Sequence, residues 1–368
     1  FRIKDLMLLF KNSILCLSLF TITLFSQDSF LKDDKWNFHE LRKAYSKDSS
    51  KWPKPDLDEG IEHNELKAVS TVSDEILKQP IVKLGQRLFH EPRLSKNNDI
   101  SCATCHVPNN AFIQNTSVSV GHNGLVGTRN APTLFGLQNS KNLFWDGRAK
   151  SLEEQAIGPI LNPVEMGFTK EEFKEKIKNL TGYEDELKVI FGDDKLTVDR
   201  ITDSLAAYEK TLKAPKTKFD AFMEGDSDAL NDREILGLHI FRTKARCLNC
   251  HSGETFSDDK FHNLGLTYYG REKYEDFGLY NITKNNDDVG KFKTPTLRQI
   301  SNTAPYMHNG LFPHLRGVTN MYNAGMFHHK PKEHQINDPK FPKTSPILKK
   351  LNLTKEEQSA LILFLQTL

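Results

Sequence analysis

Two short stretches of this sequence decide its fold: Cys102-Ala-Thr-Cys105-His106 and Cys247-Leu-Asn-Cys250-His251. Each has two cysteines separated by two residues and followed at once by a histidine. This is the spacing of covalent haem attachment, in which two thiols add to the porphyrin vinyl groups and the histidine ligates the iron. The residue counts give roughly 0.002 such matches by chance, so two matches predict two covalently bound haem c groups.

A redox disulfide and a zinc knuckle are the alternatives for each cysteine pair. A redox dithiol does not require His106 or His251. Zinc needs further cysteine or histidine ligands at knuckle spacing, and His262 is the only histidine soon after the second pair. Haem attachment accounts for every residue of both motifs.

The composition is that of an ordinary soluble protein. The 368 residues are 38% apolar and 27% charged, with a net charge of +2. Lys and Arg are interleaved with Asp and Glu, so nothing favours a nucleic-acid partner. The two motifs lie 145 residues apart, which leaves room for one domain around each.

Residues 1–26 have the pattern of an export signal. Arg2, Lys4 and Lys11 are followed by the apolar run 13–25 and then by polar sequence. The run is short for a membrane span, and an uncleaved anchor is the alternative. We expect a periplasmic protein, because haem c is attached in an exported compartment.

Helical patterns dominate the remainder. Apolar spacing predicts helices over 73–89 and 231–241, ahead of the two motifs, and over 170–190 and 197–212 between them. A capping box at residues 354–357 predicts a final helix. Strand signals are few. The predicted fold class is therefore mainly α, with two cytochrome c-like haem domains and few short strands.

From about residue 77 to the C-terminus the chain resembles the bacterial di-haem cytochrome c peroxidases and their relative MauG. Ordered motifs carry the resemblance in addition to the two haem motifs. These are Leu84-Gly-x-x-Leu-Phe-x-x-Pro-Arg-Leu-Ser95, Ser119-Val-Gly-His122, Arg129-Asn-Ala-Pro-Thr133, Phe144-Trp-Asp-Gly-Arg-Ala149, Gln155-Ala-x-Gly-Pro159, Val164-Glu-Met166, Thr294-Pro-x-Leu-Arg298 and Ala304-Pro-Tyr-Met-His-Asn-Gly310.

The resemblance implies four segments. Residues 1–26 are the signal peptide, 27–70 a linker or N-terminal extension, 71–225 an N-terminal peroxidatic cytochrome c domain, and 226–368 a C-terminal electron-transfer cytochrome c domain. Hydrogen peroxide would be reduced at the first haem, and the second haem would supply it with electrons.

Four residues match the family's first-haem site. His122 matches a displaceable distal ligand, although its glycine neighbours also suit an ordinary loop histidine. Glu165 matches the distal acid, which takes a proton from one peroxide oxygen and returns it to the other; an exposed helix-cap carboxylate is the alternative. Gln155 and Pro159 match residues that shape the same pocket.

Trp145 matches an aromatic group between the two haems, where an indole can carry an electron; a core tryptophan is the alternative, and both roles are compatible. The sixth ligand of the second iron is a methionine in the peroxidases and a tyrosine in MauG. Counting from His308 places this ligand on Tyr322, with Met326 as the alternative. Tyrosine would lower the haem potential, whereas methionine would favour ordinary electron delivery.

The family also holds a calcium ion between its domains, and Asn130, Thr303 and Pro305 fall on the matching positions. The implied electron donor is a small cytochrome c or a cupredoxin, and a homodimer is suggested. We therefore predict a di-haem cytochrome c peroxidase. The alternatives are a MauG-like di-haem oxidase that acts on a partner protein and a plain electron carrier.

Overall fold

The computed structural model describes residues 29–368, so the predicted signal peptide lies outside the described residues. Helices dominate, and the strands form two separate two-stranded antiparallel sheets. The prediction of a mainly α fold is confirmed. None of the described helices is long and apolar enough to cross a membrane.

The elements follow the chain in a simple order. The helices are α1 Phe38–Tyr45, α2 Asp74–Leu77, α3 Pro80–Phe89, α4 Cys102–Cys105, α5 Leu152–Leu161, α6 Lys170–Lys178, α7 Glu184–Phe191, α8 Val198–Glu209, α9 Lys218–Met223, α10 Asp232–Arg242, α11 Tyr280–Thr283, α12 Leu315–Asn323 and α13 Lys355–Leu365, and the strands are β1 Leu31–Lys32, β2 Lys35–Trp36, β3 Phe261–Asn263 and β4 Lys291–Lys293.

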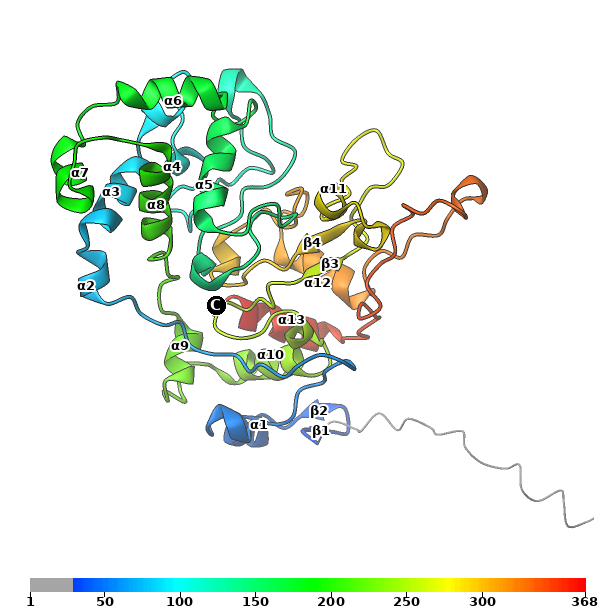
Figure 1. Cartoon of the computed structure of the whole chain (residues 1–368). Coiled ribbons are helices and arrows are strands. Elements are labelled where there is room, and N and C mark those ends of the chain that lie inside the picture. The colour runs from blue at the N-terminus through cyan, green and yellow to red at the C-terminus, as the bar shows by residue number, and fades with distance from the viewer. Residues whose placement is uncertain (1–28) are drawn as a thin grey trace, which may run out of the picture.

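The first hydrophobic core, within residues 82–214, lies around α3, α5 and α8. α3 crosses α8 closely because Gly85 has no side chain: a Cβ atom there would lie 1.8 Å from the Ser204 carbonyl oxygen. This crossing positions the chain that enters α4, which carries the first cysteine pair. In Figure 1 these elements, coloured cyan to green, form one body.

The second hydrophobic core repeats the arrangement with α10 and α13. Here Gly237 permits the close crossing, since a Cβ atom would lie 2.1 Å from the Ala360 carbonyl oxygen. The second cysteine pair begins shortly after α10, on a short 3-10 helix, Cys247–Asn249. Each haem motif thus follows a helix that is fixed by a glycine-mediated crossing.

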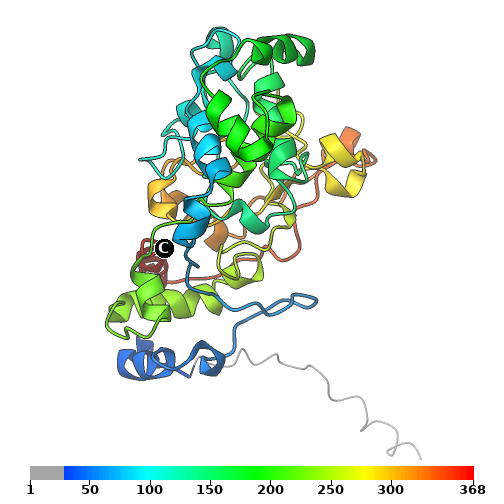
Figure 2. The same cartoon turned by 60° about the vertical axis from the view of Figure 1, so that its left-hand side comes forward.

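The segment from residue 29 to residue 66 packs against the second core. Leu41, Tyr45, Trp52 and Leu66 are buried there with side chains of α9, α10 and α13. Both views show α1 beside α10, far from α3 to α7 (Figures 1 and 2). The second core is therefore built from residues that precede the first core in the sequence and from residues that follow it.

Two predicted helices are each divided in two. The pattern over 73–89 becomes α2 and α3, because Pro80 lacks an N–H group and begins a new helix at its N1 position. The pattern over 170–190 becomes α6 and α7, separated by a turn in which Gly182 has φ +98°. The predicted helices after Thr197, Asn231 and Thr354 form as expected, and in each the named residue is the N-cap.

Candidate active site

One cavity of about 740 Å³ connects the two haem motifs. Its lining residues come from both cores and from the segment 61–64 of the N-terminal part. All six predicted attachment residues line it: Cys102, Cys105, His106, Cys247, Cys250 and His251.

The two motif histidines are oriented in the same way. His106 Nδ1 lies 3.1 Å from the Phe112 carbonyl oxygen, and His251 Nδ1 lies 2.8 Å from that of Phe256. A backbone carbonyl that accepts from Nδ1 fixes the tautomer and leaves Nε2 as the atom for a metal. Burial lowers the pKa of both rings, which favours the neutral form that ligates iron.

The four thiols do not resemble a redox centre. None of them forms a disulfide, and burial raises the pKa of Cys102 and of Cys247 to about 12. Redox dithiols have a lowered thiol pKa. Paired thiols and an oriented histidine at each end of one cavity fit two haem groups.

Glu165 lies in the wall of this cavity, near the first motif. Its Oε1 accepts a hydrogen bond of 2.8 Å from Asn162 Nδ2. Burial raises the pKa of Glu165, while the charge of Arg148, which also lines the cavity, and the Asn162 bond oppose that rise. The carboxyl is thus held by one oxygen in a sheltered position.

Gln155 and Pro159 line the same part of the cavity. Both belong to α5, where a one-turn spacing puts them on the same face of the helix. Glu165 is joined to this helix because the next residue, Met166, donates its backbone N–H to the Pro159 carbonyl. The structure thus groups Glu165, Gln155 and Pro159, three of the four residues that were matched to the first site.

Aromatic rings cluster in the wall of the cavity that connects the two motifs. Trp145 lines the cavity, donates from Nε1 to the Asn130 carbonyl at 2.9 Å, and makes an edge contact with His308 at 6.4 Å between ring centroids. His308 stacks on Phe292 at 3.6 Å. Burial lowers the pKa of His308 to about 4. The sequence identified Trp145, but not the rings that continue from it.

The His122 side chain is not in the cavity wall, although Gly121 is. His122 donates its backbone N–H to the carbonyls of Val164 and Glu165, and its ring lies against Gly167. Its Nε2 is 3.1 Å from Asn123 Nδ2. The loop of His122 and the segment of Glu165 are therefore pinned together, with the imidazole beside the cavity.

At the second motif the two ligand candidates differ in position. Tyr322, on α12, lines the cavity, and the charges of Cys250 and Cys247 act on its hydroxyl. Burial raises the pKa of Tyr322. Met326 is buried after the end of α12 and does not line the cavity, whereas Met307 does.

The residues predicted for calcium also meet at this cavity. Asn130, Thr303 and Pro305 all line it, and Asn130 donates its backbone N–H to the His308 carbonyl at 2.7 Å. The Asn130 side-chain nitrogen donates to the carbonyls of residues 116 and 117, which leaves Oδ1 for a cation. Oxygen donors of this kind suit calcium.

Two polar features of the cavity escaped the sequence reasoning. Asp258 Oδ2 lies 2.8 Å from His262 Nε2, next to Cys250. Glu209, at the end of α8, lines the first site, and its Oε2 has no partner among the described residues. His262 was noted in the sequence only as a possible zinc ligand, and nothing in the local sequence shows that Glu209 faces the cavity.

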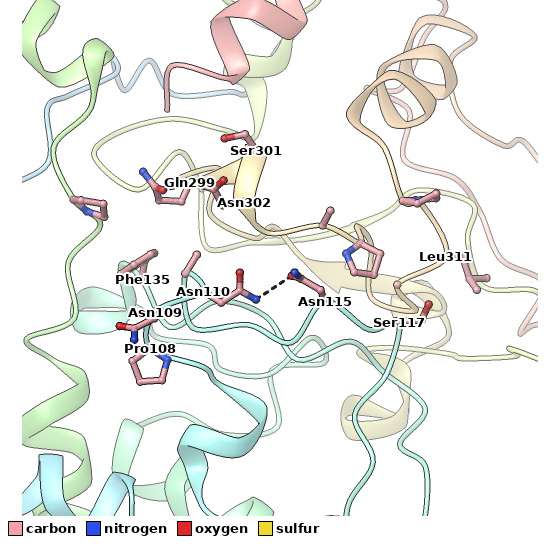
Figure 3. Close-up of a pocket in the computed structure, with 16 residues that line it drawn as sticks. Pro108, Asn109, Asn110, Asn115, Ser117, Phe135, Gln299, Ser301, Asn302 and Leu311 are labelled. Atoms are coloured by element: carbon pink, nitrogen blue, oxygen red, sulfur yellow. Dashed lines mark hydrogen bonds between the residues drawn. The ribbon is translucent and has the colours of Figure 1, made fainter.

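A second cavity, of about 1080 Å³, opens between residues 108–117 and 299–313. Figure 3 shows amide side chains around it, with Asn110 donating to Asn115 at 3.0 Å. It shares Phe135 and Pro305 with the cavity of the two motifs, and no charged side chain lines it. Its lining contains neither a carboxylate nor a histidine that could act as a general acid or base.

Comparisons with known proteins agree with this geometry. The model of the family described as di-haem cytochrome c peroxidase matches residues 79–228. Cytochrome c551 peroxidase of Nitrosomonas europaea is 41% identical over 232 residues, which are 62% of this chain and 69% of that protein. Methylamine utilization protein MauG of Methylophilus methylotrophus is 32% identical over 77% of this chain and 81% of its own.

Solved structures are similar over most of the fold. A MauG-like protein associated with microbial copper homeostasis has a TM-score of 0.69 and 27% identity, and the match covers 85% of this chain and 94% of that chain. The diheme peroxidase BthA from Burkholderia thailandensis has a TM-score of 0.65 and 23% identity, with 86% and 95% covered. The second likeness supports the fold alone.

Proposed function

The chain belongs to the di-haem cytochrome c peroxidase family, and we propose that it reduces hydrogen peroxide to water at the Cys102/Cys105 site, with electrons that enter at the Cys247/Cys250 site. The observation that carries this proposal is the single cavity that reaches both motifs and has Glu165 in its wall. When bound, the two haem groups supply the irons that accept electrons and pass them to peroxide.

Reduction of one hydrogen peroxide molecule to two waters consumes two electrons and two protons. Glu165 moves the proton within the site. Asn162 holds Oε1, so Oε2 is the atom that takes a proton from one peroxide oxygen and returns it to the departing one. Burial raises the pKa of this carboxyl and so brings it closer to the range in which it can both accept and release a proton.

The neighbouring residues position this exchange. Gln155 and Pro159 form the α5 side of the pocket and limit the space around Glu165. The His122 loop packs on the Glu165 segment, so movement of His122 toward or away from the pocket alters access to it. Trp145 and His308, which contact each other in the wall of the cavity that reaches both sites, would carry electrons from one site to the other.

The proposal is tested with the holoprotein, hydrogen peroxide and a reduced small cytochrome c or cupredoxin. Glu165→Gln should lower the turnover rate by about 100-fold or more, because general acid–base catalysis typically contributes this much. Both haem groups should remain attached. The matched control is Glu171→Gln, since Glu171 is exposed on α6. Equal turnover of the two variants would remove Glu165 from the reaction.

One observation favours a second function, a MauG-like oxidase that acts on a partner protein. Tyr322, and not Met326, lines the cavity at the second motif. A tyrosine ligand would lower the potential of the second haem and favour the storage of oxidising equivalents. A spectroscopic redox titration separates the two functions: a high-potential His/Met signature at the second haem would contradict Tyr322 as its ligand.

We propose that both haem groups are covalently attached, through Cys102 and Cys105 and through Cys247 and Cys250. Both haem groups should stay with the polypeptide in denaturing gel electrophoresis, and replacing Cys102 and Cys105 by Ala should release only one of them. Calcium is proposed at Asn130, Thr303 and Pro305, which all line the cavity. Chelation and metal analysis of the purified protein test this site.

A periplasmic location is proposed from the apolar run 13–25 and from the two haem motifs. Cell fractionation tests it. A small cytochrome c or cupredoxin is proposed as the electron donor, and a homodimer as the assembly. Analytical ultracentrifugation of the holoprotein measures the latter.

A further inference from the structure

A long excursion of the chain, residues 327–350, separates α12 from α13. We call this segment the basic arm. Apart from one 3-10 turn, Glu333–Gln335, it has no regular secondary structure. Figure 1 shows it in orange to red, reaching outward beyond α12.

The basic arm concentrates positive charge. It contains six lysines and two acidic residues, a net charge of +4, whereas the whole chain has +2 and the remainder therefore −2. Asp338 is already engaged, because the Tyr269 hydroxyl and the Lys340 backbone N–H donate to it. Four lysines are exposed and have no ion-pair partner within residues 29–368: Lys330, Lys332, Lys343 and Lys350.

The arm is braced against the domain. Phe341 packs edge-on against Tyr269 at 5.5 Å between ring centroids, and Lys340 lies 5.5 Å from the Tyr280 ring centroid. The Ser345 N–H donates to the Asn263 carbonyl at 2.9 Å. The lysines are thus presented on a surface that tertiary contacts hold in place.

The base of the arm forms part of the second haem site. Ile347, Leu348 and Lys349 line the same cavity as Tyr322. Lys349 also forms an ion pair with Asp58 at 3.0 Å. Just after the arm, Leu351 donates its backbone N–H to the Asn323 carbonyl at the end of α12. A protein bound to the arm would therefore lie next to the site where electrons enter.

The arm also exposes large apolar side chains. Phe327 is 47% exposed and Ile336 is 63% exposed. Small apolar contacts with surrounding charges are typical of short-lived protein–protein interfaces, in which the charges steer the partner and set its orientation. Electron donors must bind briefly and leave after each transfer.

We infer that the basic arm is the docking surface for the electron donor, and that the donor is a small redox protein with an acidic face. This inference rests on the proposed function, because it assigns a partner to the Cys247/Cys250 site. Reduction of one peroxide molecule requires two docking events when each donor delivers one electron.

The test compares two triple variants of the holoprotein. The arm variant combines Lys330→Glu, Lys332→Glu and Lys343→Glu. The control combines Lys83→Glu, Lys170→Glu and Lys174→Glu, which changes the net charge equally. These lysines are exposed on α3 and α6 and lack ion-pair partners in the described structure. The probes are a reduced cupredoxin with an acidic surface, mitochondrial cytochrome c with its basic surface, and the neutral reductant hydroquinone.

The arm variant should lower kcat/KM for the acidic cupredoxin by about tenfold or more at low ionic strength, and the loss should shrink as salt is added. Turnover with hydroquinone should be unchanged. Binding of the acidic cupredoxin, measured by titration calorimetry, should weaken in parallel. Equal losses in the arm and control variants would overturn the inference.

A membrane surface is the other polyanion that a lysine-rich arm could meet. Loss of binding to anionic phospholipid vesicles in the arm variant, with cupredoxin kinetics unchanged, would overturn the docking of a protein donor. An unmutated protein that binds the acidic cupredoxin through the arm but does not reduce peroxide would support the docking surface and contradict the proposed function.

Discussion

Glu209 is a buried carboxyl group of the cavity that the proposed reaction does not use. It is 4% exposed, and its Oε2 has no hydrogen-bond partner in the described chain. Burial, with a smaller contribution from Glu153, raises the pKa of Glu209 from 4.5 to about 8. At neutral pH the folded protein therefore keeps a proton on Glu209 that the unfolded chain releases.

Stability should consequently fall as the pH rises through this range. Between pH 4.5 and about 8 the folded state binds more protons than the unfolded state, so the free energy of unfolding decreases with increasing pH. Glu209→Gln removes the effect. It should be more stable than the unmutated protein at pH 8, by on the order of 1 kcal/mol or more, and equal to it below pH 4.5.

Denaturant unfolding of the holoprotein at several pH values measures this difference. A Gln variant that is less stable than the unmutated protein at pH 8 would show that the Glu209 carboxylate has a stabilising partner in solution.

For single residues, the sequence predicted those that belong to contiguous motifs. It missed cavity residues that stand outside any motif. The cysteine pairs, Glu165 and Trp145 were found because each stands in a recognisable string of neighbours. Glu209 was not, because one glutamate at the end of an amphipathic helix has the same local sequence whether it faces water or a cavity.

The helix crossings depend on single glycines. A Cβ atom on Gly237 would overlap the Ala360 carbonyl, so Gly237→Ala should force α10 and α13 apart and cost about 2 kcal/mol or more. Gly317 on α12 is the matched control, because a Cβ atom there meets nothing within 4 Å. Gly317→Ala should stabilise the protein by about 0.5–1 kcal/mol, since alanine favours the helix.

Thermal or denaturant unfolding compares the two substitutions. Equal effects would mean that helix propensity, and not the close approach of α10 to α13, decides the outcome at residue 237.

Gly167 connects the His122 loop to the Glu165 segment. A Cβ atom at this position would lie 2.6 Å from the His122 ring, and the φ of +83° is also unfavourable for alanine. Gly167→Ala should displace the imidazole and alter the absorption spectrum of the first haem, leaving the second unchanged. Gly192 has the same φ with nothing near its Cβ position, so Gly192→Ala controls for backbone strain.

Identical spectra for Gly167→Ala and the unmutated protein, in both the oxidised and the half-reduced states, would argue against His122 as a ligand of the first iron.

Local signals predicted helix starts better than helix continuity. The capping boxes at Asn231 and Thr354 act through hydrogen bonds within four residues, so they can be recognised without tertiary contacts. The apolar spacing across Pro80 and Gly182 continues through each break. Hydrophobic periodicity alone therefore joined elements that the backbone separates.

Arg129 joins the two halves of the molecule. It forms two hydrogen bonds with Asp276 of the second half, at 2.7 and 2.8 Å, and one of 2.5 Å with Asp146 of the first. Its side chain is 17% exposed. Arg129→Gln should cost about 3–5 kcal/mol, because the sheltered Asp276 carboxylate loses its cation, whereas Asp146 keeps Arg148.

Arg129→Gln should also let the two cores unfold more independently of each other. Unfolding followed at each haem should therefore change from one transition to two. Calorimetry combined with haem absorption measures this. Arg200→Gln is the control: the Arg200–Asp193 pair is local and its aspartate is 46% exposed, so the expected cost is below about 1 kcal/mol. A single unchanged transition in Arg129→Gln would show that other contacts couple the halves.

At the scale of the molecule, the sequence predicted two haem domains from the 145-residue separation of the motifs. It could not show which half the segment 29–66 joins. Tyr45, Trp52 and Leu66 are scattered through polar sequence without a period, and only their burial against α9, α10 and α13 reveals their place. Likewise, the sequence could not show which of Tyr322 and Met326 faces the cavity. The two residues are only four apart, but α12 ends between them, and Tyr322 lines the cavity whereas Met326 does not.

The discontinuous second core sets an order for biosynthesis. The first core is one uninterrupted stretch, whereas the second needs residues 41–66 together with residues made after 219. During synthesis, residues 41–66 therefore cannot complete their packing until the residues of the second core, from Phe219 onward, have been made. All residues of the first core have been made by residue 214, so that core can pack first, and the packing of residues 41–66 onto α9, α10 and α13 comes last.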